Sequence, residues 1–409
     1  MPRTARLAFL TFCLLPTLGV GGWAWYWRSA AHVQSWEAEL SRWLRVRAKL
    51  EDVVHPVPGV VRLHGVRLAD AETGAEVLRA GAVEIRRRGG LLELELAQPV
   101  VYASRAERLV AAAADLLVYQ PPDLPAMVTF RAAELTVRRP GFKYVARQVT
   151  GGMRLGPQAS VFELAFVPME GGARPARLKV VRDRRGEPGY ALTLSTGDAA
   201  VACALVAPRA ADWLGAEAHL RGSASLWQTG GSWSGQVAGE LRHVDLHRLI
   251  SEHFPHQLTG KARLELEELL IEQGRIAQAS GTLQGGPGLI SRSLLASAGQ
   301  ALGLSPGRDA LPPPHQPLVA YARFACRFTI GREGLVLSGQ ASRALPGAIL
   351  VDTYRPLWTE PAVQPQPAAA LVRALVPAGQ GSVPAAPQAV LLLRWLPLEG
   401  ADLAPAEDR

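Results

Sequence analysis

From about residue 58 onward the sequence repeats one pattern, in which short runs of alternating apolar and polar residues are separated by glycine-rich turns. The runs include Leu92–Leu96, Val161–Phe166, Tyr190–Leu194, Val201–Leu205 and Ala262–Leu266. Successive side chains of a strand point to opposite faces, so each run predicts a strand with one apolar face. Short spacing without long helices between the runs favours an antiparallel meander over βαβ units. The sequence therefore predicts a mostly β fold, a long twisted antiparallel sheet curled into a groove or a sandwich.

A few segments depart from this alternation and predict short helices. Residues 104–117 are rich in alanine, residues 289–304 carry Leu294, Leu295 and Ala298 at helical spacing, and a shorter segment covers about 246–253. Apolar residues that recur at intervals of three and four mark one face of a helix. We expect these helices to interrupt the sheet without dividing it into βαβ units.

The amino-terminal segment Leu7–Trp27 contains no charged residue. As a helix it would measure about 31 Å, which matches a hydrocarbon core of roughly 30 Å. Trp23, Trp25 and Trp27 lie at one end, as aromatic residues do at membrane interfaces. The alternative is a cleaved signal peptide, but the apolar run is long and lacks a clean small-residue cleavage site. We therefore expect a single-pass inner-membrane anchor over 7–27, with residues 1–6 in the cytoplasm and the bulk in the periplasm.

Residues 31–51 predict an amphipathic helix, because Trp36, Leu40, Trp43 and Leu50 recur on one face. Two interpretations remain open for this helix: it lies on the membrane surface, or it caps the first sheet. Beyond it we expect a β-rich region over 52–245 and a second β module over 246–352 that contains the helix 289–304. Residues 353–409 are rich in proline and alanine and predict an extended tail, in which 389–398 is a last strand or a docking peptide.

Composition and motifs argue against catalysis. Three cysteines cannot staple 409 residues. No nucleophile elbow or phosphate-binding loop is present, so we expect a protein that is not an enzyme and needs no cofactor. His243 and His247 are weak candidates for metal ligands, since they are four residues apart but have no base or third ligand placed beside them. The net charge of +8 comes with arginine runs that lack interleaved aromatic residues, so we expect no nucleic-acid partner.

Two stretches of the chain resemble the AsmA-like family of bacterial envelope proteins. The first begins with the amino-terminal span and continues through Pro58–Asp70 (PGVVRLHGVRLAD), Val77–Ile85 (VLRAGAVEI) and Leu91–Val101 (LLELELAQPVV). The second runs from Val244 to Leu304 and is similar to the family's carboxyl-terminal module. The resemblance implies a twisted sheet that curls into an apolar groove, and a role in phospholipid movement and outer-membrane assembly.

An apolar strand face that helices do not fill can hold acyl chains, because each buried methylene contributes about 0.8 kcal/mol. The candidate groove residues from the alternation are Leu92, Leu94, Leu96, Phe162, Leu164 and Phe166. We accordingly expect membrane lipids as ligands, the inner membrane as a partner through 7–27, and envelope proteins as further partners. The alternative is a non-catalytic scaffold, in which the apolar faces pack on each other as a closed sandwich and the proline-rich tail recruits a partner.

Overall fold

The computed structural model describes residues 10–27, 29–102, 113–118, 124–139, 142–169, 172, 174–183, 189–206, 208–307, 316–376 and 392–397. The fold is mostly β, with 54% strand and 21% helix, which confirms the predicted class. The chain divides into two compact units, Met1–Met169 and Glu170–Arg409. The predicted boundary at 245/246 lies inside the second unit, because the strands on either side of it pair in register. The two units are described in turn.

The amino-terminal segment of the first unit is helical but is not one uniform helix. A π-helical turn, η1 (Leu10–Leu14), leads into α2 (Leu15–Trp27), and residues 7–9 of the predicted anchor lie outside the described residues. Within the described residues, none of the helices combines the length and the apolar character needed to cross a membrane. Large apolar side chains of α2 are nevertheless exposed, namely those of Leu15, Leu18, Val20 and Trp25.

The helix predicted over 31–51 is shorter than expected and lies against the sheet. It is α3 (Ala30–Leu44), capped by Ser29 and ended by Arg45 in a left-handed conformation with φ 52°. Residues 47–49 instead form β1 (Arg47–Lys49), which pairs with β3 (Val60–Ala69). Side chains of α3 reach these strands, since Ala48 N donates to Ser41 Oγ over 3.0 Å and Leu50 N donates to Glu37 Oε1 over 2.8 Å. Of the two interpretations, these contacts favour the cap on the first sheet.

A pair of histidines joins the start of α3 to β2 (Asp52–Val57). The Nε2 atoms of His32 and His55 lie 3.0 Å apart, and the ring of Trp27 packs on both histidines. Burial and the neighbouring His32 lower the pKa of His55. Two neutral rings can share one proton as donor and acceptor, whereas two protonated rings have no acceptor and repel each other.

We predict that acid weakens the contact between His32 and His55 and lowers the stability of the protein. Because the folded state lowers the pKa of His55, the unfolded chain binds more protons at mildly acidic pH. Stability is therefore full above about pH 6.5 and falls as the pH drops through the lower pKa of the folded state. Thermal unfolding of the full chain between pH 7.5 and 5 measures the slope, which His55→Gln should reduce. The matched control is His64→Gln on β3; an equal reduction by both variants would contradict the assignment.

The sheet of the first unit is mixed. Its further strands are β4 (Glu76–Arg88), β5 (Leu91–Ala97), β6 (Val100–Tyr102), β7 (Met127–Arg139), β8 (Phe142–Leu155) and β9 (Ala159–Pro168). Neighbouring strands are antiparallel except that β5 and β6 run parallel to β7. The expectation of a purely antiparallel sheet is wrong here. The connection from β6 to β7 includes a helix at 113–118. It brings the chain back to the end of the sheet where β6 begins, as a parallel pair of strands requires.

The second unit is built on a longer antiparallel meander. Its first strands are β10 (Ala176–Asp183), β11 (Gly189–Ser195), β12 (Val201–Ala202), β13 (His219–Thr229), β14 (Ser232–Asp245), β15 (Lys261–Glu272) and β16 (Arg275–Gly285). They are followed by β17 (Gly288–Ser291), β18 (Ser305–Pro306), β19 (Leu318–Tyr321), β20 (Arg323–Gly331), β21 (Gly334–Gly339), β22 (Ala348–Val351) and β23 (Pro356–Thr359). β17 and β19 form a separate two-stranded sheet.

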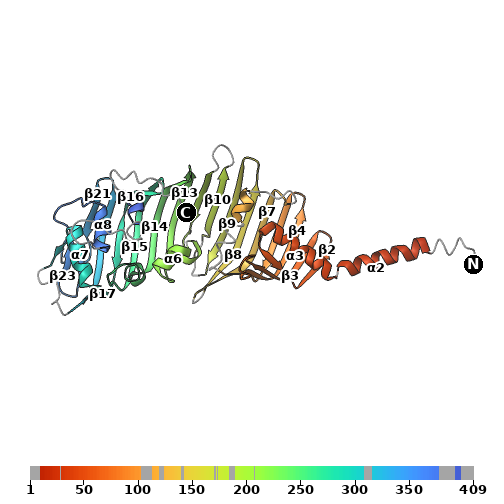
Figure 1. The fold of residues 1–409 in the computed structure, drawn as a ribbon, viewed down its shortest axis with the longest axis horizontal. Coiled ribbons are helices and arrows are strands. Elements are labelled where there is room, and N and C mark those ends of the chain that lie inside the picture. The colour runs from red at the N-terminus through yellow and green to blue at the C-terminus, as the bar shows by residue number, and fades with distance from the viewer. Residues whose placement is uncertain are drawn as a thin grey trace, which may run out of the picture. The chain divides into compact units, whose positions relative to one another are not determined.

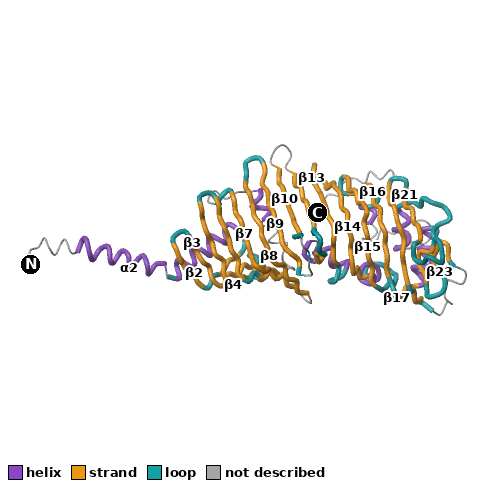
Figure 2. The backbone as a smooth tube through the Cα atoms, turned by 180° about the vertical axis from the view of Figure 1, so that it is seen from behind, coloured by secondary structure: helices purple, strands orange, loops and turns teal. Residues whose placement is uncertain are grey.

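Helices of the second unit gather on one face of this sheet, as Figure 1 and the reverse view in Figure 2 show. They are α5 (Cys203–Val206), α6 (Pro208–Leu214), the π-helical turn η3 (His247–Ser251), α7 (Arg292–Leu302) and α8 (Ala369–Leu375). α7 falls within the helix predicted over 289–304. The strand predicted over 201–205 ends at Ala202, because residues 201–204 are all buried and apolar, and such a run does not separate strand from helix.

The carboxyl-terminal segment is not a free tail over its whole length. Leu357 in β23 and Val372 in α8 are almost completely buried, so these two elements belong to the core of the second unit. The side chain of Gln364 replaces a strand partner, since it accepts from Leu337 N over 2.9 Å and donates to Leu337 O over 2.7 Å. Leu396 packs with Val372 and Phe254, so the described part of 389–398 docks on α8 and is not a strand. Residues 377–391 and 398–409 lie outside the described residues.

Candidate functional site

All six predicted groove residues lie on one face of the sheet in the first unit. Directly paired positions share a face, and the pairing gives the row Val61, Ile85, Leu94, Phe130, Gly151 and Leu164 across β3, β4, β5, β7, β8 and β9. Leu92 and Leu96 flank Leu94 on β5, and Phe162 and Phe166 flank Leu164 on β9. Of the six, Leu92 and Phe166 are buried and the other four are half-buried. The sheet thus presents a continuous apolar face.

Aromatic rings fill part of this face. A Cβ added to Gly151 would lie 2.2 Å from Cζ of Phe130, so the ring of Phe130 covers the glycine. The rings of Phe130 and Phe162 are stacked, with centroids 6.4 Å apart. Both rings are half-buried and present apolar surface on the same side as Leu94.

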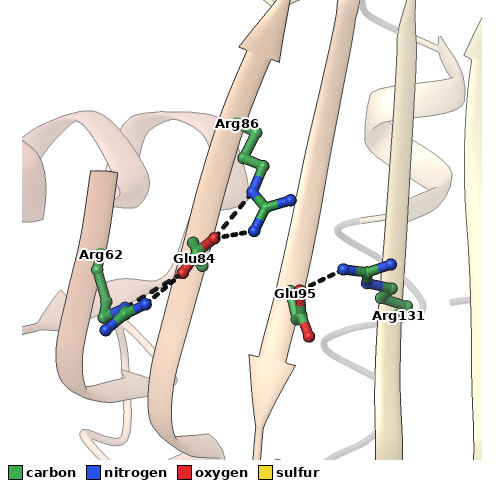
Figure 3. A network of polar contacts seen from close by, with 5 residues as sticks. All are labelled: Arg62, Glu84, Arg86, Glu95 and Arg131. Carbon is green, nitrogen blue, oxygen red and sulfur yellow. Dashed lines mark hydrogen bonds and ion pairs between the residues drawn. The ribbon is translucent and has the colours of Figure 1, made fainter. Parts of the chain in front are cut away.

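The opposite face of the same strands carries ion pairs, which Figure 3 shows in close-up. Arg62, Glu84, Glu95, Arg131 and Thr150 form the neighbouring row. Glu84 accepts from Arg62 Nη2 over 2.6 Å and from Arg86 Nε over 2.8 Å, and Arg131 Nη2 donates to Glu95 over 2.5 Å. The sheet is therefore two-faced, since charged side chains occupy the face that water reaches.

We predict that Glu84→Gln lowers stability by about 1 kcal/mol, a small value because both arginines remain partly in water. Hydrogen bonds from Arg62, then Arg86, hold the pKa of Glu84 below its ordinary value of 4.5. The contribution of the Glu84 carboxylate to stability is therefore present above about pH 4.5. It is lost as the pH falls through the lower pKa that Glu84 has in the folded state. Denaturant unfolding at pH 7 and at pH 3.5 checks this. The difference in unfolding free energy between the wild type and Glu84→Gln should be smaller at pH 3.5 than at pH 7. An equal difference at both pH values would contradict the prediction.

The second unit repeats the two-faced design over more strands. One row contains Leu178, Leu194, Ala224, Val237, Leu269, Ala279, Ile330 and Leu335, on eight paired strands from β10 to β21. The row beside it is mostly polar, with Lys179, Thr193, Ser225, Gln236, Leu270 and Gln278. Residues of the apolar row on β10 to β15 are half-buried, whereas Ala279, Ile330 and Leu335 are buried near α7 and α8.

A cavity of about 390 Å³ lies within the second unit, against this apolar face. Its sheet wall includes the directly paired row Leu241, Leu264, Leu283 and Cys326, together with Phe324, Phe328 and Leu337. Its helical wall includes Ile250 of η3, Leu294 and Ala298 of α7, and Leu371 and Leu375 of α8. Every lining residue is aliphatic, aromatic or cysteine, and the volume is in the range of small-molecule sites.

Three of the described lining residues carry polar side-chain atoms, namely Tyr321, Trp358 and Cys326. Tyr321 donates its hydroxyl to Thr259 O over 2.6 Å, and Trp358 Nε1 donates to Leu295 O over 3.3 Å. Burial raises the pKa of Cys326 to about 12, so its thiol stays neutral. Cys203 and Cys326 are both free. The described residues that line the cavity therefore offer an apolar contact area for a ligand and include no carboxylate, amine, guanidinium or imidazole group.

The weak metal candidates do not form a site. His243 and His247 are both exposed, and the ring of His243 lies edge-on to that of His219 with centroids 6.1 Å apart. Across the part of the chain that the structure describes, no group of three or more histidine, cysteine, aspartate or glutamate side chains is arranged to hold a metal ion.

The sequence marked only some of the residues that line the cavity. Alternation marked Ala262–Leu266 and helical spacing marked Leu294 and Ala298, but joining these segments with Leu371 and Leu375 requires the fold. Comparisons of the chain with protein-family models, with curated proteins and with solved structures find no match.

Proposed function

We propose that this protein is a non-catalytic lipid-binding protein that holds acyl chains against the apolar face of its β-sheet. The cavity of about 390 Å³ in the second unit carries the proposal, because the described residues that line it are all apolar or uncharged. An apolar surface of this kind gains free energy from an apolar guest, with about 0.8 kcal/mol for each methylene that leaves water. The half-buried apolar row on β10 to β15 continues the same surface.

The proposal includes an attachment to the inner membrane through residues 7–27, with the bulk of the chain in the periplasm. The exposed apolar side chains on α2, those of Leu15, Leu18, Val20 and Trp25, support this attachment, since such side chains are more stable in hydrocarbon than in water. A tethered lipid-binding sheet fits a role in moving phospholipid and in envelope assembly, as the AsmA-like resemblance implies. Envelope proteins are the further partners that this role suggests.

Mass spectrometry of the full chain purified in mild detergent tests the proposal. We expect phospholipid to co-purify, and the purified chain to take up labelled phospholipid from donor liposomes. A chain that carries no phospholipid and takes up none would leave the scaffold alternative, in which the apolar face serves packing alone.

A further inference from the structure

A short segment near the carboxyl end of the chain docks on the second unit. Residues 392–397, which we call the strap, contain one helical turn closed by a hydrogen bond that Leu396 N donates to Leu392 O over 3.2 Å. The side chain of Leu396 is buried, and those of Leu392 and Leu393 are half-buried. Trp395 on the same turn is 63% exposed. The strap therefore has one apolar side against the protein and another side in solvent.

The docked side of the strap reaches the helical wall of the cavity. Three half-buried side chains pack against the cluster that contains Leu396, namely those of Ile250 on η3 and of Leu371 and Leu375 on α8. The same three side chains line the cavity. Because they belong both to the cavity wall and to the docking site, the strap covers the wall that η3 and α8 form.

The strap is held by apolar contacts. Within the described part of the chain, it forms no hydrogen bond or ion pair with residues outside itself. The helix α8 has additional support, since Ser297 Oγ on α7 donates to Ala374 O over 2.7 Å and Val372 is completely buried. Segments with few buried apolar contacts open locally at the lowest cost in free energy. The strap should therefore leave its docking site while α8 stays in place.

Release of the strap would uncover the outer side of the cavity wall. Ile250 belongs to η3, a π-helical turn of five residues, and such turns are rare and frequently lie at functional sites. Leu371 and Leu375 belong to a separate element, α8. Without the strap, the apolar side chains of both elements lose their cover. An acyl chain can then replace the leucines of the strap and enter between η3 and α8.

We propose that the strap controls the entry of acyl chains into the cavity. While it is docked, it closes the wall between η3 and α8, and its release lets this wall open. The inference rests on the proposed lipid-binding function and adds a means of regulating that site. Such a cover sets the rate of uptake, because the closed state must open before a ligand enters. It leaves the final amount of bound lipid unchanged when the strap docks again over the filled cavity.

The experiment follows the uptake of labelled phospholipid from donor liposomes over time by the full chain. Leu396→Ser removes the buried side chain of the strap and should raise the initial rate about tenfold, which corresponds to about 1.4 kcal/mol less favourable docking. Leu393→Ser removes a half-buried contact and should raise the rate by a smaller factor. The final amount of lipid per chain should stay at the wild-type value in both variants. The matched control is Trp395→Ser, on the exposed side of the same turn, which should keep the wild-type rate.

Wild-type initial rates in both leucine variants, or an equal acceleration by Trp395→Ser, would overturn the inference. A lower melting temperature together with a lower final uptake would also overturn it, because the segment would then serve folding alone. If the wild type and all variants take up no phospholipid, the proposed function fails, and hydrogen exchange of the lipid-free chain then judges the strap. Faster exchange of the η3 and α8 amides in Leu396→Ser than in Trp395→Ser would support a releasable cover, and equal exchange would reject it.

Discussion

Leu264→Glu is expected to reduce phospholipid uptake by at least about tenfold while the protein remains folded. Leu264 on β15 belongs to the sheet wall of the cavity. It is directly paired with Leu241 on β14 and with Leu283 on β16, the two strands that flank β15. A carboxylate there must either lose its water when an acyl chain enters or keep the chain out, and the cost of such desolvation is several kcal/mol. Leu264 is half-buried, so the charge can stay hydrated in the empty protein.

Two further variants keep this prediction decisive. Leu264→Trp fills the cavity without adding a charge, and it should also lower uptake if the cavity holds the acyl chains. Glu265→Gln changes the next residue on the opposite face of the same strand and should leave uptake unchanged. Labelled-lipid uptake and a thermal melt are measured for all three. Normal uptake by both Leu264 variants would contradict the assignment of the cavity.

Leu357→Ala is expected to destabilise the second unit by about 3 kcal/mol, within the usual range of 2–5 kcal/mol for a buried leucine. Leu357 is 1% exposed and packs in the main core of the second unit, beside Trp358 and Leu350. A loss of this size should lower the melting temperature of the unit by roughly 6–12 °C.

Val336→Ala is the matched control for this stability prediction, because Val336 is 39% exposed on β21. It should change stability by less than about 1 kcal/mol. Denaturant unfolding followed by far-UV circular dichroism compares the two. If Leu357→Ala changed stability as little as Val336→Ala does, β23 would not belong to the core. That result would support the extended tail that the proline content predicts.

Local alternation predicted the strands well, because it reflects a physical difference between two faces of a sheet. Leu92–Leu96 and Tyr190–Leu194 alternate in sequence and form β5 and β11 with apolar residues on one side. Alternation failed where both faces are buried, as at residues 201–204, since no polar residue then marks the second face. Alternation also cannot reveal the parallel pairing of β5 with β7, because the direction of pairing depends on the connection and not on a local pattern.

The candidate site was only partly predictable, because its residues come together through pairing between distant segments. The sequence placed the six groove candidates on apolar faces, and the structure brings them to one face of the first unit. Composition placed residues 353–409 outside the fold, yet Leu371 and Leu375 of α8 line the cavity. Proline and glutamine are compatible with a packed segment when side chains such as that of Gln364 satisfy a strand's backbone groups.

The most direct test of the central claim is photo-crosslinking of the full chain with a phospholipid that carries a photoreactive group at the end of one acyl chain. Peptide mapping should place the crosslinks on the walls of the cavity, in the regions of Leu241, Leu264 and Leu283 on the sheet and Leu294 and Leu371 on the helices. Crosslinks confined to α2, or absent from the chain, would contradict an acyl-chain site in the second unit.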